Sequence, residues 1–560
     1  MKMKKLLALL LALCMVLALA ACTDSTNGDS ENTNNAKDQL ENQENQGNLE
    51  NLDEDANSYI RDQLTLAWNT ASSLTCWGTN NDIPGNYEVY EMLYEVSSDG
   101  ELYPLLADAS YDGNFMPGCD HEDGSGVYTV KIYDYIHDHN GTPVTAEDVA
   151  FSFMYQYENE TTSDWGDLVS VEAEDDTTVV FTFTEDQDGL GQLSNILCRC
   201  FIVSEKSFTE SASGLVNEMC GTGPYKFVSY TSGSELVLER YEDYWQKDEL
   251  RRQEQQANVQ KIVYKFIDEA AQRSVALKTG TVDFVHELPA DNALDFADGG
   301  EYADQYNVYS YAAKFVYYLT PNCSEQSVCG DINMRLAILN AIDQDGLVTA
   351  LGGTNTRLNA YVTDYYNDYG MVAWDSLDNY NTRSSVDTAL VKQYLDAAGY
   401  NNEQIVIVET GVDDAAQIVA AQLQACGINA TVQTLDFSSY QARIADSSAW
   451  DLDLGMMAGD YNVQVWAHAF SYGNTGDGDH TSSYVVDQEW EDLLNLVNTE
   501  DGHTSENMQA WWQHAVDNAY TMGLYSSIIY DIIPEDTTYV CLGDKLTVLP
   551  GGFTFADPNA

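Results

Sequence analysis

One stretch decides the fold: QIVIVETGVDDAAQIVAAQLQACGINATVQTLD, residues 404–436. It begins with a short run of β-branched residues, which is typical of a buried strand. An alanine-rich segment of helix length follows and ends at Gly427, and a second strand-like run starts at Ile428. Strand, helix and strand in this order predict a βαβ unit with parallel strands and a right-handed crossover.

The same pattern occurs earlier in the chain. VQKIVYKFI, residues 259–267, precedes a helical segment that ends at Gly280, and TVDFVHEL follows soon after. Two helix-like segments, residues 331–347 and 386–398, lie between the two units. Because the units are far apart in sequence, we expect two α/β lobes, each with its own parallel sheet. A cleft between two lobes is a common place for a ligand.

Two more helices are expected in the first part of the chain. Residues 87–96 have a helical pattern. TAEDVAFSFMYQYE, residues 145–158, opens with Thr145 and has Asp148 three positions on, much like a capping box. The alternating runs at residues 128–136 and 176–185 predict strands.

The composition excludes several classes of function. The chain has 560 residues, too many for one ordinary core, and 24 basic against 90 acidic residues give a net charge of −66. Such a surface repels nucleic acids, so we expect no nucleic-acid partner, and nearly all acidic side chains are expected in water. No G-x-S-x-G, H-E-x-x-H, P-loop or complete G-x-G-x-x-G occurs. We therefore predict no enzyme, no cofactor and, since His-x-His at 137–139 is a weak signal alone, no metal.

The N-terminus predicts export and anchoring. MKMKK precedes a 15-residue apolar run, residues 6–20, which is short for a membrane span of about 20 residues. The run ends in Leu19-Ala20-Ala21-Cys22, which resembles the lipobox of bacterial lipoproteins. The resemblance implies that residues 1–21 are removed and that Cys22 carries the lipid. Residues 22–57 are rich in Asn, Gln, Asp and Glu and predict a disordered tether.

Several blocks, in order, resemble the peptide/nickel-type solute-binding proteins of ABC transporters, which are extracellular solute-binding proteins of family 5. These blocks are YTVKIYDYIHDHNGTPVTAEDVAFSF, GTGPYKFVSYTSGSELVLERYEDYW (residues 221–245), VQKIVYKFIDEAAQRSVALKTGTVDFV, INMRLAILNAIDQDGLV (residues 332–348) and YLDAAGY. No single block is decisive, but their order and spacing extend over most of residues 60–560.

The resemblance implies a two-lobed, class C binding protein of α/β fold. It places lobe I at residues 58–312, with an extra subdomain at about 83–215, lobe II at residues 313–515, and a return to lobe I at residues 516–560. It implies a monomer, anchored on the outer face of the cell membrane, that captures peptides. The loaded protein then docks on an ABC permease, whose partner ATPase subunits drive import.

The resemblance also implies the site. In oligopeptide-binding members, an Asp-Tyr pair ends a tryptophan-containing segment, and its aspartate pairs with the peptide α-amino group. Asp460 and Tyr461 occupy the matching place, with Met457 where a tryptophan is common and Gly459 where an alanine is. A buried ammonium needs such a partner. Three further aromatic residues are candidates to line the cleft: Trp77, Trp374 and Trp466.

Other interpretations of the same fold stay open. Stacking on sugars would suit the 37 tyrosines and 10 tryptophans, so an oligosaccharide or a metal complex is an alternative ligand. A surface lipoprotein that signals through a partner, in place of feeding an importer, is another.

Overall fold

The computed structural model describes residues 59–556 except 72, 78–82, 97–101, 122–124, 160–167, 185–195, 199, 253–254, 298, 353–354, 359–368, 378–385, 412–413, 459–482, 498, 500–501 and 539–547. Every described residue belongs to one compact unit, Asn48–Ala560. Among the described residues, no helix has both the length and the apolar character that crossing a membrane requires. The predicted lobe boundaries stay predictions.

The strands are β1 (Leu64–Trp68), β2 (Tyr94–Val96), β3 (Leu102–Pro104), β4 (Cys119–His121), β5 (Val127–Lys131), β6 (Leu168–Asp175), β7 (Thr178–Phe183), β8 (Tyr225–Thr231), β9 (Glu235–Arg240), β10 (Lys261–Phe266), β11 (Phe284–Pro289), β12 (Tyr306–Pro321), β13 (Asn355–Arg357), β14 (Gln404–Glu409), β15 (Asn429–Thr434), β16 (Leu452–Ala458), β17 (Met522–Pro534), β18 (Thr537–Thr538) and β19 (Thr554–Phe555). The α-helices are α3 (Asn86–Val89), α4 (Ala146–Glu158), α6 (Glu205–Glu210), α7 (Ala270–Lys278), α8 (Ala290–Ala293), α9 (Ile332–Asn340), α10 (Gln344–Ala350), α11 (Thr388–Ala398), α12 (Ala415–Ala425), α13 (Phe437–Ile444), α15 (Gln488–Val497) and α16 (Ser505–Asp517). Short 3₁₀ helices are η3 (Asp248–Leu250), η5 (Val328–Gly330), η6 (Tyr369–Met371), η7 (Trp374–Ser376) and η9 (Pro550–Gly552).

The second βαβ unit forms as predicted. β14 and β15 pair in parallel, with Gln404 opposite Asn429 and Glu409 opposite Thr434, and α12 connects them. Ile405 and Ile407 are fully buried, which explains why the apolar run of this strand is nearly continuous. β14 also pairs in parallel with β16, so β14, β15 and β16 form what we call the second parallel group.

The first βαβ unit has its expected strands and helix, but the pairing prediction was wrong. β10 and β11 do not pair with each other, because β1 lies between them and pairs in parallel with both. β1 comes about 195 residues earlier in the chain, and no local pattern indicates that it inserts there. We call β1, β10 and β11 the first parallel group.

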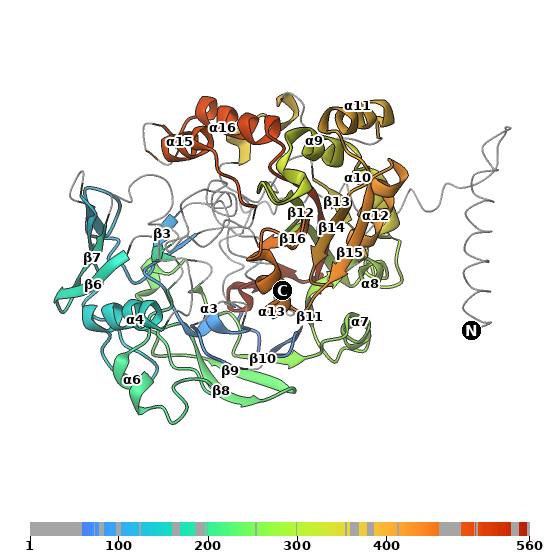
Figure 1. The fold of residues 1–560 in the computed structure, drawn as a ribbon. Helices are drawn as coiled ribbons and strands as arrows, with labels where there is room; N and C mark the ends of the chain where they lie inside the picture. The colour runs from blue at the N-terminus through green and yellow to red at the C-terminus, as the bar shows by residue number, and fades with distance from the viewer. Residues whose placement is uncertain are drawn as a thin grey trace. The chain divides into compact units, whose positions relative to one another are not determined.

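A single mixed sheet of eleven strands contains both parallel groups, where two separate sheets were expected. Figure 1 labels strands of both groups, β10 and β11 of the first and β14, β15 and β16 of the second. Its order is β15-β14-β16-β12-β17-β11-β1-β10-β9-β8, and β13 also pairs with β17. Two long strands join the groups: β12, with 16 residues, pairs with β16 of the second group, and β17, with 13 residues, pairs with β11 of the first. β12 and β17 also pair with each other, which makes the sheet continuous. The α/β class is as predicted, with a mixed sheet and helices between the parallel strands.

A second, smaller sheet has four strands in the order β4-β5-β7-β6, and α4 packs against it. The predicted capping box at the start of α4 is present. The Asp148 carboxylate accepts the backbone N–H of Thr145 at 2.8 Å and also the N–H of Glu205, the first residue of α6, at 2.8 Å. One buried acid therefore fixes the start of two helices.

The helix expected at residues 87–96 is mostly absent. α3 covers only Asn86–Val89, and the chain then extends into β2, which pairs with β3. Glu88, Glu91 and Glu95 in this segment are all buried, at 4%, 3% and 6% exposure. The expectation that nearly all acids lie in water therefore fails in this segment.

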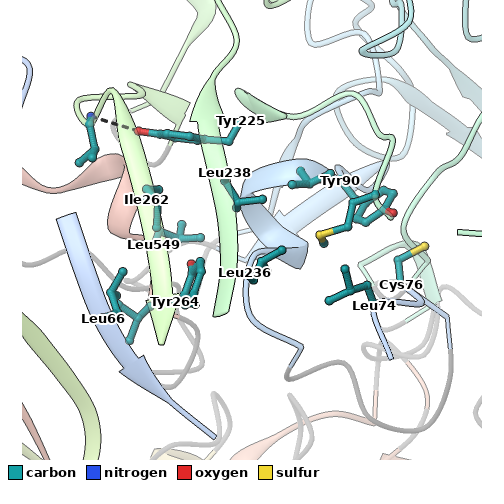
Figure 2. Packing of buried hydrophobic residues seen from close by; sticks show 14 of the residues in the cluster. Leu66, Leu74, Cys76, Tyr90, Tyr225, Leu236, Leu238, Ile262, Tyr264 and Leu549 are labelled. Carbon is teal, nitrogen blue, oxygen red and sulfur yellow. Dashed lines mark hydrogen bonds between the residues drawn. The ribbon is translucent and has the colours of Figure 1, made fainter. Parts of the chain in front are cut away.

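Hydrophobic packing under the first parallel group is shown in Figure 2. Side chains from β1, β9 and β10 meet there, among them Leu66, Leu236 and Ile262. The buried Tyr225 hydroxyl accepts the backbone N–H of Val259 at 3.1 Å, so a polar group inside this core is satisfied. A different cluster, built around the second parallel group, includes α9, α10 and α12.

Candidate ligand site at the carboxyl ends of the strands

The carboxyl ends of both parallel groups point to the same part of the sheet. β11 is antiparallel to β17 and its last residue, Pro289, lies opposite Ile529. β16 is antiparallel to β12 and its last residue, Ala458, lies opposite Phe315. β12 and β17 pair there too, with Ala312 opposite Ile528 and Val316 opposite Ser526. Ligands of open α/β sheets bind outside the carboxyl ends of strands, so this is the candidate site.

We call the crossing point, residues 312–316 of β12 and 526–529 of β17, the junction. The register between β12 and β17 shifts here, between Ala312 and Val316. On its other edge, β17 pairs with β11 up to Ile529 and with β13 at residues 525–527. Bulges bend strands and are common next to binding sites. The junction is therefore the place where the two groups meet and where the sheet changes direction.

The first group presents a stacked and hydrogen-bonded row at its carboxyl edge. The rings of Trp68 and His286 stack at 4.6 Å between centroids. His286 Nδ1 lies 2.8 Å from the fully buried Asp531 carboxylate of β17, which also accepts the backbone N–H of Glu287 at 2.9 Å. Glu287 has a φ of 53° at the register shift of β11, a strained conformation of the kind found at binding sites.

A guanidinium lies beside this row. Arg273 of α7 donates from Nη1 to the Asn69 side-chain oxygen at 2.7 Å, directly after β1 ends. Asp268, just past β10, accepts the N–H and the hydroxyl of Thr70 at 2.7 and 3.0 Å, and these hydrogen bonds lower its pKa. Sequence analysis missed Arg273, His286 and Asp531. Their position near the carboxyl ends of the predicted parallel strands is a signal that could have pointed to this edge of the sheet, but the sequence analysis did not use it.

The second group carries a buried acid. Asp453 of β16 is 1% exposed, and both of its oxygens lie 3.0 Å from the Tyr440 hydroxyl of α13. Burial raises the pKa of Asp453 to about 7, and the hydrogen bond from Tyr440 opposes this. Glu409, at the end of β14, accepts the hydroxyl of Thr434 and the N–H of Gly411.

Most of the predicted site residues lie outside the described residues. Asp460, Tyr461 and Trp466 fall in the segment 459–482, and the side chain of Met457 is not described either. The backbone of Met457 pairs with Val316 at the junction. The roles of these residues stay predictions, as does lipid modification of Cys22, which precedes the described residues.

Trp77 and Trp374, the other two predicted residues, are each 5% exposed. Trp77 packs with Phe151, Tyr155 and Phe208, and its indole N–H donates to the Phe201 carbonyl at 2.9 Å. Trp374 packs against Trp512 in a different cluster, at 5.2 Å between ring centroids. Both are held by core contacts.

Replacing Trp77 with Phe tests these core contacts. We expect Trp77→Phe to lower the free energy of unfolding by about 1–3 kcal/mol, because the Phe201 carbonyl loses its indole donor and the smaller ring leaves space. Urea unfolding measures this change. A ligand affinity that falls more than tenfold in a variant of unchanged stability would show that Trp77 contacts the ligand.

The His-x-His segment is held by the backbone. His139 Nε2 lies 2.9 Å from the Gly223 carbonyl, and burial lowers the pKa of His139 to about 4. Asp138 accepts the N–H groups of Asn140 and Thr142, each at 2.9 Å. These contacts give the segment a role in fixing a turn. Within the described part of the chain, no group of three or more His, Cys, Asp or Glu side chains is arranged to hold a metal.

A small pocket, partly open to solvent, lies beside Glu91 and not at the junction. Glu91 accepts hydrogen bonds from the Tyr244 hydroxyl at 2.5 Å, from Trp245 Nε1 at 2.7 Å and from Gln255 Nε2 at 3.2 Å. Its oxygens are thus occupied by protein donors, which leaves little for a ligand at this place.

Comparison with known proteins identifies the fold and the family. Residues 101–479 match the sequence model of the bacterial extracellular solute-binding proteins, family 5. A probable peptide ABC transporter periplasmic-binding protein of Sinorhizobium fredii is 27% identical over 354 residues, which are 59% of this chain and 64% of that protein. A probable D,D-dipeptide-binding periplasmic protein of Escherichia coli is 25% identical over 50% of this chain and 52% of that protein. The matches therefore span about half to two thirds of these relatives.

Solved structures resemble the whole fold at low sequence identity. The oligopeptide-binding protein AppA of Bacillus subtilis, in complex with a nonapeptide, has a TM-score of 0.67 and 16% identity, covering 89% of this chain and 100% of AppA. The binding protein AgaA of A. tumefaciens R10, in complex with agropinic acid, has a TM-score of 0.67 and 19% identity, covering 88% and 99%. These similarities confirm the predicted two-lobed binding-protein fold.

Proposed function

The chain belongs to family 5 of the bacterial extracellular solute-binding proteins, and from this premise we propose that it captures peptides between its lobes and delivers them to an ABC importer. The observation that supports this most is the convergence of both carboxyl edges on the junction. β16 ends at Ala458, opposite Phe315 of the junction, and Asp460 follows two residues later.

Peptides are favoured over other solutes by the sequence relatives. Both curated relatives described above are named for peptide or dipeptide binding. Similarity of fold does not distinguish between a peptide and another solute as the ligand, since AppA with its nonapeptide and AgaA with agropinic acid have the same TM-score. A small organic acid is therefore the second candidate ligand. Delivery to a permease and anchoring through Cys22 belong to the proposal as well.

In this proposal Asp460 pairs with the peptide α-amino group. A fixed carboxylate in a site from which water is excluded compensates the desolvation of the ammonium. Main-chain hydrogen bonds from the strand ends then hold the peptide backbone without reading its side chains.

Thermal unfolding with peptide pools tests the function. A ligand at 100 times its dissociation constant stabilises the folded protein by about 2.7 kcal/mol. We expect a pool of tri- to pentapeptides to stabilise the protein, and a sugar mixture to leave it unchanged. Stabilisation by sugars and by no peptide would contradict the peptide proposal.

The Asp460→Ala variant tests the amino-group role. We expect it to lower the affinity for peptides with a free amino terminus by about tenfold or more, and the affinity for N-acetylated peptides far less, because only the free peptides carry the ammonium. Asp477→Ala removes the same charge from the same segment and serves as the matched control. Equal losses for free and acetylated peptides would contradict the role of Asp460.

A further inference from the structure

Arg273 is a buried guanidinium with too few partners. It is 6% exposed, and a guanidinium has five N–H donors and stays charged in proteins. Toward the described residues it makes two hydrogen bonds, the one to Asn69 at 2.7 Å and a long one from Nη2 to the Glu287 carbonyl at 3.5 Å. Its buried Nε–H has no described partner, and no described carboxylate lies within ion-pair distance. Burial of such a charge is costly when it is not paired.

Arg335 shows how this protein satisfies a guanidinium that serves the fold. It is also 6% exposed. Its Nε donates to the Asn518 carbonyl at 3.0 Å, and its Nη1 donates to the carbonyls of Cys329 and Gly330 at 2.9 and 3.0 Å. Equal burial thus goes with three short hydrogen bonds in Arg335 and one in Arg273. The difference indicates that Arg273 keeps donors for something other than the fold.

The position of Arg273 indicates what that partner is. The side chain lies between the end of β1 and the bulge of β11, at the carboxyl edge that faces the junction. It belongs to the first turns of α7, whose N-terminus favours negative charge, and Glu269 at the N-cap makes no side-chain capping hydrogen bond. The nearest acids are Asp268 and Glu287. Asp268 is already engaged by Thr70, and Glu287 is half exposed.

We propose that Arg273 is the anion-binding residue of the ligand site and that its guanidinium pairs with a carboxylate of the bound solute. The planar fork of Arg matches two carboxylate oxygens, and the pair would supply the missing acceptor of a buried cation. A net charge of −66 repels anions in general, so a bound carboxylate needs a local cation of this kind. This inference rests on the proposed solute-binding function, and it holds for a peptide carboxyl terminus and for a small organic acid alike.

The experiment compares acids with their neutral amides. The probes are a tri- to pentapeptide pool with free carboxyl termini, the same pool with amidated termini, and glutarate against glutaramide. Apparent dissociation constants come from thermal unfolding at increasing probe concentration. For the free-acid pool we expect Arg273→Gln to raise the constant on the order of 30-fold, and for the amidated pool by less than about twofold, because only the acid uses the charge.

Two further variants separate binding from folding. Lys278→Gln removes the same charge from the other end of α7, where Lys278 pairs with Asp295 at the surface, and is expected to keep the preference for acids. Arg273→Lys keeps the charge without the fork and is expected to restore part of that preference. A purely structural Arg273 would change the unfolding of the free protein and leave the ratio of acid to amide affinity unchanged.

Each possible result of these measurements either supports or contradicts the role of Arg273. Three results would overturn the proposal. In the first, Arg273→Gln keeps the wild-type ratio of acid to amide affinity; in the second, it weakens acid and amide equally. In the third, the wild-type protein binds no carboxylate probe. If glutarate binds through Arg273 and neither peptide pool binds, the peptide function fails while the anion-binding role of Arg273 stands. If the free-acid pool binds and the variant loses it selectively, both stand.

Discussion

Glu91→Gln is expected to lower the free energy of unfolding by about 2–4 kcal/mol. The Glu91 carboxylate, 3% exposed, accepts from Tyr244 and Gln255 on one oxygen and from Trp245 on the other. An amide of the same size offers one acceptor oxygen and one NH₂ group. Whichever way it turns, its NH₂ faces a buried donor, so at least one hydrogen bond is lost and one donor is left unpaired.

The effect extends beyond one side chain because Glu91 connects distant segments. It lies between α3 and β2, whereas Tyr244, Trp245 and Gln255 come from the chain after β9. Urea unfolding followed by tryptophan fluorescence measures the change. The matched control is Glu172→Gln on the exposed side of β6, which is expected to stay within about 0.5 kcal/mol of the wild-type protein. Equal stability of the two variants would show that the Glu91 network contributes nothing.

The segment around Glu91 also shows where prediction from sequence stops. Residues 87–96 have helical spacing, but Glu88, Glu91 and Glu95 each turn inward to a tyrosine hydroxyl. Tyr264 and Tyr244, the partners of Glu88 and Glu91, come from distant parts of the chain, whereas Tyr103, the partner of Glu95, is close in sequence. Glu95 and Tyr103 lie on the paired strands β2 and β3, so a local partner draws the chain out of the helix. A pattern over ten residues contains no information about hydroxyl groups more than 150 residues away.

The second βαβ unit was predictable because the sequence patterns that specify it are consecutive in the chain. The apolar run of β14, the helix that ends before Gly427 and the run of β15 are consecutive, and the paired strands are neighbours in sequence. In the first unit the local elements are right, and only the insertion of β1 between β10 and β11 escapes prediction. Local patterns define the elements, whereas tertiary packing decides which strands become neighbours.

The residues of the candidate site also fall into those that the sequence could indicate and those that it could not. Asp460 came from resemblance, and its segment lies outside the described residues. Arg273 and His286 belong to no motif. Arg273 stands out because it is buried with a donor that lacks a described partner, and His286 because its partner Asp531 is distant in sequence; only the three-dimensional structure shows either property. Trp77 and Trp374 were chosen because they are large and aromatic, a property that core and cleft residues share.

Asp453→Asn is expected to make the protein more stable at pH 8, by about 2–4 kcal/mol. Asp453 is buried on β16, and toward the described residues it has one hydrogen-bond donor, Tyr440, and no cation. Its ionised form is therefore poorly compensated, and burial raises the pKa of this carboxyl to about 7. An asparagine keeps the size and an acceptor for Tyr440 and removes the buried charge. Its NH₂ group meets no described acceptor, a cost of about 1–3 kcal/mol that the removal of the charge is expected to exceed at pH 8.

The dependence on pH follows from the same shift. The folded protein holds the Asp453 proton up to about pH 7, whereas the unfolded chain releases it near pH 4. Between these values the folded state binds more protons, so the contribution of Asp453 to stability falls as the pH rises and is lost above pH 7. The advantage of Asp453→Asn is therefore expected to be small at pH 5 and to grow up to pH 8. Urea unfolding of both proteins at pH 5, 6, 7 and 8 measures the difference, in which all other titrating groups cancel.

Asp451→Asn, two residues away, is the matched control and is expected to have the opposite effect. Asp451 is also buried, but it accepts from the Ser327 hydroxyl at 2.7 Å, from the Val328 N–H at 3.3 Å and from the Val406 N–H at 2.9 Å. Its charge is compensated by donors on both oxygens, so an amide there leaves a buried N–H unpaired and costs about 1–3 kcal/mol at pH 8. The same substitution is thus expected to stabilise at Asp453 of β16, where the carboxylate has few donors, and to destabilise at Asp451, just before β16, where it has several. Destabilisation by both variants at pH 8 would show that Asp453 is held as an ion by contacts other than Tyr440.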